Sequence, residues 1–311
     1  MQATSNILMI RPVQFDYNEQ TALSNAFQNS SAANAEVQKK ALEEFDRFTE
    51  ILQKNGVNVL VVEDTPAPHT PDSIFPNNWI ATYNDGKVFL YPMQAENRRQ
   101  ERRTDIIDTL KTRFTVSSVT DLSYFESEEK FLEGTGSMVL DRDNKIAYAC
   151  LSPRTDPEVL KKFCDLSSYK LISFNSTDKS GKAIYHTNVM MCIGNKFAVI
   201  CLETILDEAE KANIISSLKN TGKEIIEITE EQMNSFAGNM LELKNTHGES
   251  LLIMSEQALN SLRDDQISIL KKHAKIISSS LNTIETNGGG SARCMIAEIH
   301  LPEKINFSIF K

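Results

Sequence analysis

The chain has 311 residues, of which 41% are hydrophobic and 24% are charged, and its formal net charge is −9. This composition is typical of a globular protein with a substantial core. The negative charge and the lack of long lysine or arginine runs argue against nucleic acid and anionic membrane surfaces as main partners.

The sequence also suggests a cellular compartment. No stretch of about 18 apolar residues occurs, so no membrane-spanning helix is expected. No basic segment followed by an apolar one precedes the first predicted strand, so we expect no signal peptide. The five cysteines form no CxxC pair, which is typical of free thiols in a reducing compartment. We therefore expect a cytoplasmic protein.

The first predicted elements are a strand over residues 7–11, an amphipathic helix over 35–55 and a buried strand over 57–62. A proline-rich loop leads to a hairpin with strands at 79–83 and 88–91. Its turn, Asn84-Asp85-Gly86, has favourable turn chemistry. A helix over 95–112 and a strand over 115–119 complete a unit of two strands, a helix and a strand.

This order of elements recurs along the chain. The second copy has strands at 137–141, 146–150 and 170–174 and a helix at 157–165. The third has strands at 188–193, 197–202 and 224–228 and a helix at 206–218; the fourth has strands at 239–243, 250–254 and 275–278 and a helix at 257–273. The last copy begins with 292–300 and continues with 305–309, and the N-terminal segment supplies its helix and final strand.

The leading strands begin near Asn78, Gly136, Thr187, Gly238 and Ala292. They lie roughly 50 to 60 residues apart, a spacing that indicates a repeat architecture. The pattern favours five ββαβ units in a closed ring over the alternative, a plain mixed α+β sheet.

In a ring, the loops before the leading strands meet at one axis. These loops contain Asp72, Glu133, His186 and Cys294. Two carboxylates, an imidazole and a thiol suit a nucleophilic site with a base and an orienting pair. Cys294 follows Gly288-Gly289-Gly290, whose backbone can approach a ligand closely.

Each of these residues also has a structural interpretation. A lone cysteine is more often a buried core thiol, and we keep that interpretation for Cys150, Cys164, Cys192 and Cys201. Single loop acids and a single histidine are usually structural or solvated. Arg98, Arg99, Arg102 and Arg103 are interpreted as a solvated helix face from which one arginine reaches a substrate carboxylate.

Several motifs resemble those of the guanidino-group-modifying superfamily, the penteins, which includes arginine deiminase, dimethylarginine dimethylaminohydrolase, agmatine deiminase and glycine amidinotransferase. The resemblance extends from residues 7–12 to Gly288–Cys294 and implies a five-bladed α/β propeller with pseudo-fivefold symmetry, a single domain over residues 1–311. It implies Cys294 as nucleophile, His186 as general acid/base, Glu133 as its partner and Asp72 as the acid that binds guanidino or ureido nitrogens. Arg98, Arg99 and Arg154 resemble arginines that bind the substrate α-carboxylate.

Two departures from the superfamily pattern concern the substrate. Deiminases commonly have His-x-Asp where this chain has His186-Thr187-Asn188. A guanidinium loses an ionic partner at Asn188, whereas a neutral ureido group loses much less. Arginine deiminases also often have histidine where this chain has Arg293. The pattern Gly-Gly-Gly-Ser-x-Arg-Cys resembles a bacterial branch associated with citrulline use.

The resemblance thus implies a hydrolase that cleaves C–N bonds of linear amidines or ureido groups through a covalent, thiouronium-type adduct on Cys294. A protonated His186 is expected to lower the pKa of the thiol. No metal or organic cofactor is expected, and the partner is a small guanidino or ureido amino acid. The alternatives are an amidinotransferase and a non-catalytic ligand-binding or partner-binding member of the fold. A homodimer is left open.

Overall fold

The described strands form small mixed sheets. The computed structural model describes residues 1–22, 25, 27–28 and 34–304. Its five three-stranded sheets are β3 (Ile80–Thr82), β4 (Lys87–Leu90) and β5 (Ser118–Asp121); β6 (Val139–Asp141), β7 (Ile146–Cys150) and β8 (Lys170–Phe174); β9 (Met191–Ile193), β10 (Phe197–Ile200) and β11 (Glu224–Glu227); β12 (Leu241–Lys244), β13 (Ser250–Ser255) and β14 (Lys275–Ser279); and β15 (Ala297–Glu298), β1 (Asn6–Arg11) and β2 (Asn58–Glu63).

All five sheets have the same internal order. The middle strand is antiparallel to the leading strand and parallel to the third. A parallel pair needs a crossover, and helices provide it: α3 (Glu96–Arg99) with α4 (Thr104–Arg113), α6 (Pro157–Ser167), α8 (Glu208–Asn220), α10 (Glu256–Ser261) with α11 (Asp264–His273), and α2 (Asn34–Lys54). The predicted recurrence of ββαβ units is confirmed.

The fifth unit joins the two ends of the chain. β15 pairs with β1 in the register Ile7↔Glu298 and Leu8↔Ala297, and β1 pairs with β2 along its whole length. The N-terminal segment therefore supplies the helix and the final strand, as predicted, and also the middle strand. The predicted strand over 305–309 lies outside the described residues.

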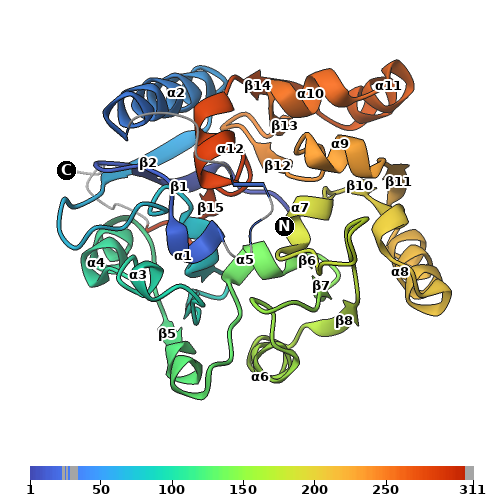
Figure 1. Cartoon of the computed structure of the whole chain (residues 1–311), viewed down its shortest axis with the longest axis horizontal. Helices are drawn as coiled ribbons and strands as arrows, with labels where there is room; N and C mark the ends of the chain where they lie inside the picture. The colour runs from blue at the N-terminus through green and yellow to red at the C-terminus, as the bar shows by residue number, and fades with distance from the viewer. Residues whose placement is uncertain (23–24, 26, 29–33, 305–311) are drawn as a thin grey trace, which may run out of the picture.

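Local sequence signals explain where the crossover helices begin. The side chain of Asp156 accepts hydrogen bonds from two amides at the start of α6, which has proline at its first position. Asp207 does the same for α8. Such caps satisfy amides that have no partner within the helix. In Figure 1 the crossover helices lie at the periphery, whereas the short helices α5 (Gly134–Ser137) and α7 (Thr187–Met190) lie near the middle.

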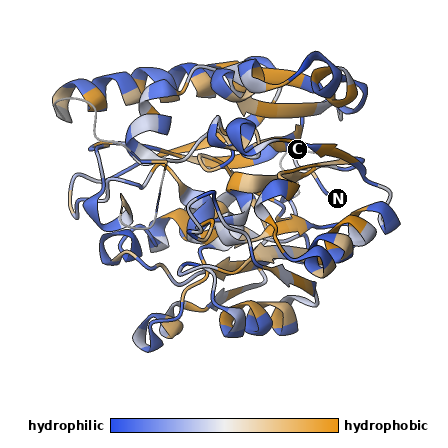
Figure 2. Cartoon of the chain, turned by 45° about the vertical axis from the view of Figure 1, so that its right-hand side comes forward, coloured by the Kyte–Doolittle hydropathy of each residue, from blue (hydrophilic) through white to orange (hydrophobic). Residues whose placement is uncertain are grey.

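The core fills the space between the sheets and the outer helices. Phe45 and Phe48 of α2, for example, pack with Ile7 and Met9 of β1, and all four side chains are buried. In Figure 2 many strand residues in the interior have hydrophobic colours, whereas the outer helices alternate between hydrophilic and hydrophobic residues. The burial of these apolar side chains stabilises each unit by removing hydrocarbon from water.

Two predicted long helices are each broken in two. The helix predicted over 95–112 is interrupted between α3 and α4, where Arg98 and Glu101 are buried as an ion pair. The helix predicted over 257–273 breaks between α10 and α11, and the carboxamide of Gln266 caps the second start by accepting from the Arg263 amide. Apolar periodicity did not reveal these breaks because polar side chains at the breaks, and not the apolar pattern, accompany them.

Candidate active site

The leading strands begin later than predicted. Before β3, β6 and β9 the chain forms short helical turns: η1 (Pro76–Asn78), α5 and α7. A further turn, residues 292–295, precedes β15. Residues that the sequence placed at strand starts therefore lie in turns, whose irregular backbone directs their side chains inward.

These turns surround a narrow cavity whose 260 Å³ of empty space includes open solvent. Of the predicted site residues, Asp72, His186, Cys294, Arg98 and Arg154 line it. Other lining residues come from the N-terminal segment, from η1 and from the glycine turn: Thr21, Asn25, Phe75, Asn78, Tyr185 and Gly288–Gly290. Glu133 lies immediately behind His186 and is fully buried.

Cys294 is held by a compact turn. Helix α12 (Asn282–Gly288) ends at Gly289, whose φ of 63° is in the left-handed region, which glycine adopts without strain. A Cβ on Gly290 would lie 2.9 Å from the ring of Phe75. Gly288 and Gly290 therefore allow close packing against Phe75, Gly289 packs against Asn25, and the three glycines do not form a slack loop. The Cys294 side chain is buried, and its amide donates to the carbonyl of Ser291.

Two side-chain amides donate to the sulfur of Cys294. The Nδ2 atoms of Asn239 and Asn188 lie 3.2 and 3.5 Å from Sγ. The orientation of Asn239 is defined, because its Oδ1 accepts from the backbone amide of Arg293 at 3.1 Å.

Asn239 was not identified from the sequence. It follows Gly238, the start predicted for the leading strand of the fourth unit, and so occupies a position equivalent to the other site residues. Gly238 packs so closely that a Cβ there would lie 2.1 Å from the carbonyl oxygen of Val189. The repeat spacing was the signal that could have revealed Asn239.

His186 and Glu133 form a buried pair that Arg154 completes. His186 Nε2 lies 2.8 Å from Glu133 Oε2, and Arg154 Nη1 donates to the same oxygen at 3.3 Å. Burial tends to raise the pKa of Glu133, but Arg154 and His186 outweigh it and hold the pKa well below its usual range. Because an ionised carboxylate only accepts, His186 donates from Nε2, and Nδ1 remains the acceptor of the ring.

The expectation of a protonated His186 is wrong for this arrangement. Burial lowers the pKa of His186 to about 4, and Glu133 only partly opposes this effect. Arg154 and Arg98 add further unfavourable charge for an imidazolium. The sulfur of Cys294 therefore accepts hydrogen bonds from Asn239 and Asn188 and does not lie beside an imidazolium.

Asp72 presents an acceptor to the cavity. Its Oδ2 accepts from Asn18 Nδ2 at 2.8 Å and from Thr21 Oγ1 at 3.0 Å. Its Oδ1 is buried and has no hydrogen-bond partner among the described residues. Burial raises the pKa of Asp72, and Arg98 opposes the rise. A buried acceptor without a partner is costly, so a ligand with an N–H group at Oδ1 is favoured.

Asn78 presents a donor, and it too was not singled out from the sequence. Its Oδ1 accepts from Arg98 Nη1 at 2.8 Å, which defines the orientation of the amide. Its Nδ2 is buried and, within the described part of the chain, makes no hydrogen bond. The wall of the cavity thus offers an acceptor at Asp72 and a donor at Asn78.

The predicted carboxylate-binding arginines are placed differently from each other. Arg98 is buried, with its guanidinium directed at Glu101, Asn78 and the carbonyls of Asp72 and Phe75. Burial raises the pKa of Glu101 to about 8, against the effect of Arg98. Arg98 therefore stabilises the turn before β3 through these hydrogen bonds. Its interpretation as part of a solvated helix face is wrong, because the side chain is buried.

Arg99 does not reach the cavity. Its guanidinium donates to the carbonyls of Met93 and Gln94, outside the cavity lining. Arg154 lines the cavity with its guanidinium 5.0 Å from the ring centre of Tyr185, and it donates to the Thr21 carbonyl. Of the three arginines, Arg154 is the one whose environment best fits contact with a ligand.

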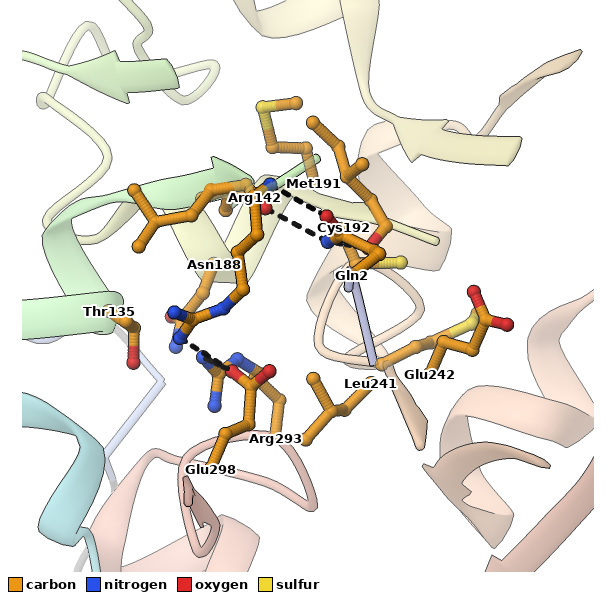
Figure 3. Close-up of a pocket in the computed structure, with 14 residues that line it drawn as sticks. Gln2, Thr135, Arg142, Asn188, Met191, Cys192, Leu241, Glu242, Arg293 and Glu298 are labelled. Carbon is orange, nitrogen blue, oxygen red and sulfur yellow. Dashed lines mark hydrogen bonds and ion pairs between the residues drawn. The ribbon is translucent and has the colours of Figure 1, made fainter. Parts of the chain in front are cut away.

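Behind Asn188 lies a second buried group of charges (Figure 3). Glu298 accepts from Arg293 at 3.1 Å and lies 3.5 Å from Arg142 and 3.0 Å from His300. Burial lowers the pKa of Arg293, whereas Arg142 and its neighbours, against burial, keep the pKa of Glu298 well below its usual range. These ion pairs anchor the chain on both sides of Cys294.

Two buried histidines make folding sensitive to acid. Burial lowers the pKa values of both His186 and His300 to about 4, against about 6.5 in an unfolded chain. Between pH 6.5 and 4 the unfolded chain therefore binds protons that the folded chain does not, and stability falls with falling pH, by on the order of 3 kcal/mol per imidazole. Urea unfolding at pH 7.5 and pH 5 measures the part of this loss that occurs above pH 5. His300→Gln should lessen it, and an equal loss in that variant would contradict the assignment.

Gly136 provides the space in which Asn78 and His186 meet. A Cβ there would lie 2.4 Å from Asn78 Nδ2 and 2.8 Å from His186 Nδ1. Gly136→Ala should therefore displace both side chains and lower kcat by about 100-fold. Gly181→Asn is the control, because a Cβ at Gly181 meets no described atom within 4 Å and asparagine tolerates the positive φ of 81° at this position. Turnover that is equally affected in both variants would refute the role of Gly136.

Two further properties bear on the kind of site. Among residues 1–22, 25, 27–28 and 34–304, no group of three or more histidine, cysteine or acidic side chains is arranged to hold a metal ion. None of the described helices has the length and apolarity needed to cross a bilayer.

Comparisons with known proteins agree with this arrangement. A model of the family described as N,N dimethylarginine dimethylhydrolase, eukaryotic, matches residues 11–301. A search of curated proteins finds no match. Among solved structures, the N-terminal domain of ArgZ, an arginine dihydrolase of Cyanobacteria, superposes with a TM-score of 0.75 at 17% identity, over 96% of this chain and 98% of that domain.

Two other solved structures are similar. Unliganded AgrE has a TM-score of 0.75 at 18% identity, over 96% of this chain and 40% of the longer AgrE chain. DDAH from Pseudomonas aeruginosa has a TM-score of 0.64 at 15% identity, over 96% of this chain and all of that one. At these identities the likeness shows the mixed α/β fold, while the family match covers nearly the whole sequence. The chain belongs to the N,N-dimethylarginine dimethylhydrolase family, hydrolases of the guanidino-modifying superfamily, as its motifs predicted.

Proposed function

We propose that the protein is a cysteine-dependent hydrolase of a small amino acid with a ureido or guanidino group, and that a ureido group such as that of citrulline is preferred. The observation that carries the preference is the Nδ2 donor of Asn78, which lacks a partner among the described residues and whose orientation Arg98 defines. A guanidinium has only N–H donors and cannot satisfy it. A ureido group satisfies it with its oxygen.

The Asp72 carboxylate at the cavity suits the N–H groups of the same ureido ligand. A ureido group has N–H donors, and Asp72 Oδ1 can accept one of them. The neutral Asn188 stands where deiminases commonly have an acid. A neutral ligand loses little at such a position, whereas a cation loses an ionic partner.

The reaction begins with attack of the Cys294 sulfur on the ureido carbon. Asn239 and Asn188 stabilise the thiolate, and His186, oriented by Glu133, accepts the thiol proton. As the S–C bond forms, the C–N bond to the alkyl chain breaks, and His186 protonates the leaving amine. Water then attacks the carbon–sulfur intermediate with His186 as base, and the released carbamic acid decomposes to carbon dioxide and ammonia.

The similar structures support covalent chemistry of this kind. One ArgZ structure is described as covalently bound to a reaction intermediate, and the DDAH structure is a cysteine-to-serine mutant in complex with citrulline. Arg154 is assigned to the substrate carboxylate because it is buried at the cavity wall.

We also propose that the five sheets are the blades of a five-bladed α/β propeller formed by one domain over residues 1–311. The contacts β6 with β9, β9 with β12 and β15 with β3 place leading strands of different sheets beside each other. A closed ring of this kind brings residues about 50 positions apart to one axis. A cytoplasmic location and the lack of a cofactor remain predictions from the sequence, which leaves a homodimer open.

A substrate panel tests the proposed reaction. Citrulline, arginine, methylated arginines and agmatine are assayed for ammonia and for the carbon product, with and without an amine acceptor. Release of carbon dioxide and ornithine from citrulline is expected. Product that appears only when an amine acceptor is present would identify a transferase. No turnover with any substrate would favour the alternative of a non-catalytic ligand-binding protein.

Asn78→Asp should reverse the substrate preference. An aspartate keeps an acceptor for Arg98 but replaces the donor at the cavity with a second acceptor. Turnover of citrulline should fall by about 100-fold or more relative to turnover of arginine. The ratio of the two kcat/KM values is the measurement, and Asn84→Asp, the same change at an exposed turn position, is the control. An unchanged ratio in Asn78→Asp would refute the role of the Asn78 donor.

A further inference from the structure

Tyr185 is a cavity residue that contacts several other parts of the site. It directly precedes His186 and is buried. The centre of its ring lies 4.6 Å from the ring centre of His186 and 5.0 Å from the guanidinium carbon of Arg154. The ring of Phe27, from the N-terminal segment, lies 6.2 Å away, edge-on. The proposed reaction assigns no role to Tyr185.

The hydroxyl of Tyr185 donates to the glycine turn that precedes Cys294. Its acceptor is the carbonyl of Gly289, 2.8 Å away, at the left-handed residue that ends α12. Burial raises the pKa of Tyr185, so the hydroxyl keeps its proton and remains a donor. Asn25 Nδ2 also reaches this carbonyl, but at 3.4 Å, where a hydrogen bond is weak. The bond from Tyr185 is therefore the stronger of these two supports of the turn.

Tyr185 also supports the loop that carries Arg154. The guanidinium lies over the tyrosine ring at a distance suited to a cation–π contact. In the same loop, Ser152 Oγ donates to the backbone carbonyl of Tyr185 at 2.8 Å. One residue therefore joins Arg154, which follows the second strand of its unit, to the glycine turn before the last described strand.

These contacts bear on both ends of the substrate. In the proposed reaction Arg154 binds the α-carboxylate, and Cys294 attacks the ureido or guanidino carbon. The number of methylenes between those two groups must match the separation of Arg154 and Cys294. The glycine turn packs against Phe75, and the Tyr185 hydroxyl holds its middle carbonyl. The turn therefore has little freedom to move away from Arg154 and admit a longer chain.

We propose that Tyr185 is a positioning residue that selects the chain length of the substrate, because it holds Arg154 and Cys294 at the separation that citrulline or arginine requires. This inference rests on the proposed function, which takes Arg154 as the carboxylate-binding group and Cys294 as the nucleophile. Tyr185→Phe removes a single oxygen, so the fold should persist. It releases the carbonyl of Gly289 but keeps the ring beneath Arg154, and a substrate with one more methylene should then be accepted better.

Two substrate pairs that differ by one methylene test this selection: citrulline with homocitrulline, and arginine with homoarginine. The native chain should favour the shorter member of the pair that it turns over by about tenfold or more in kcat/KM. Tyr185→Phe should reduce this ratio at least fivefold. Tyr148→Phe is the matched control, because it removes a hydroxyl that bonds to Ser217 at 2.7 Å, away from the cavity, and it should leave the ratio unchanged. If Tyr185→Phe slows both members equally, its role is structural only and the proposal is overturned.

Ligand binding separates this proposal from the proposed reaction. The four compounds are titrated calorimetrically into Cys294→Ala, which cannot form the adduct, and the shorter member of a pair should bind more tightly. Adding Tyr185→Phe to Cys294→Ala should diminish that preference at least fivefold. If this result holds while the native chain turns nothing over, the reaction is refuted and chain-length selection stands. A binding ratio that Tyr185→Phe leaves unchanged refutes chain-length selection, whether or not turnover occurs, and binding of none of the four compounds refutes both.

Discussion

Cys294→Ala will abolish turnover of the ureido or guanidino substrate, with a loss of at least about 10⁴-fold, because no other group can form the covalent intermediate. The substitution removes only the sulfur of a side chain in a packed turn, so the fold should persist. Ammonia release under single-turnover and steady-state conditions measures the effect, and circular dichroism measures the fold.

The other cysteines provide matched controls for this variant. Burial raises the pKa of Cys192 to about 12 and that of Cys201 to about 11, so both remain thiols at neutral pH. Cys192→Ala and Cys201→Ala should retain turnover. In the native chain, iodoacetamide should modify Cys294 faster than either of them. Full activity in Cys294→Ala would refute the nucleophilic mechanism.

Glu133→Gln should lower kcat by about 10³-fold, within the range that general acid–base groups contribute. The neutral glutamine amide no longer requires His186 to donate from Nε2, so Nδ1 is not kept free as the acceptor. Arg154 also loses the negative charge to which it donates at 3.3 Å. Since an unpaired buried charge is costly, the free energy of unfolding should also fall by about 3 kcal/mol.

A second variant separates these two effects. Glu133→Asp keeps the charge but shortens the side chain, so it should preserve more stability than Glu133→Gln while still disturbing His186. Kinetics across pH 5 to 9 and urea unfolding are compared for both variants. A Glu133→Gln enzyme whose kcat stays within threefold of the native value would show that Glu133 serves packing alone.

The order of elements was predictable because it depends on local signals. Turn sequences such as Asn84-Asp85-Gly86, helix caps such as Asp156 and alternating apolar strands lie within a few residues of the structure that they specify. The spacing of the units then placed Asp72, Glu133, His186 and Cys294 at equivalent positions, and the structure brings these four residues together around one cavity. Their chemical roles remain proposals.

The sequence did not distinguish among the arginines and asparagines. Arg98 and Arg99 are neighbours in the chain, yet Arg98 is buried at the cavity and Arg99 donates to carbonyls outside it. Asn78 and Asn239 lay at predicted strand starts, where an asparagine does not by itself indicate a functional role. Which of these side chains faces the substrate depends on contacts between residues far apart in the chain, and periodicity within one unit contains no such information.

The sequence by itself determined the repeating ββαβ unit, the family and the thiol at the fifth equivalent position, because these depend on local patterns and motifs. Only the tertiary structure decided that His186 is held neutral and that Cys294 receives hydrogen bonds from Asn239 and Asn188. It also decided that the donor of Asn78 and the acceptor of Asp72 meet at one cavity. Burial and the direction of each donor and acceptor set these properties, and both exist only once the five units have packed against one another.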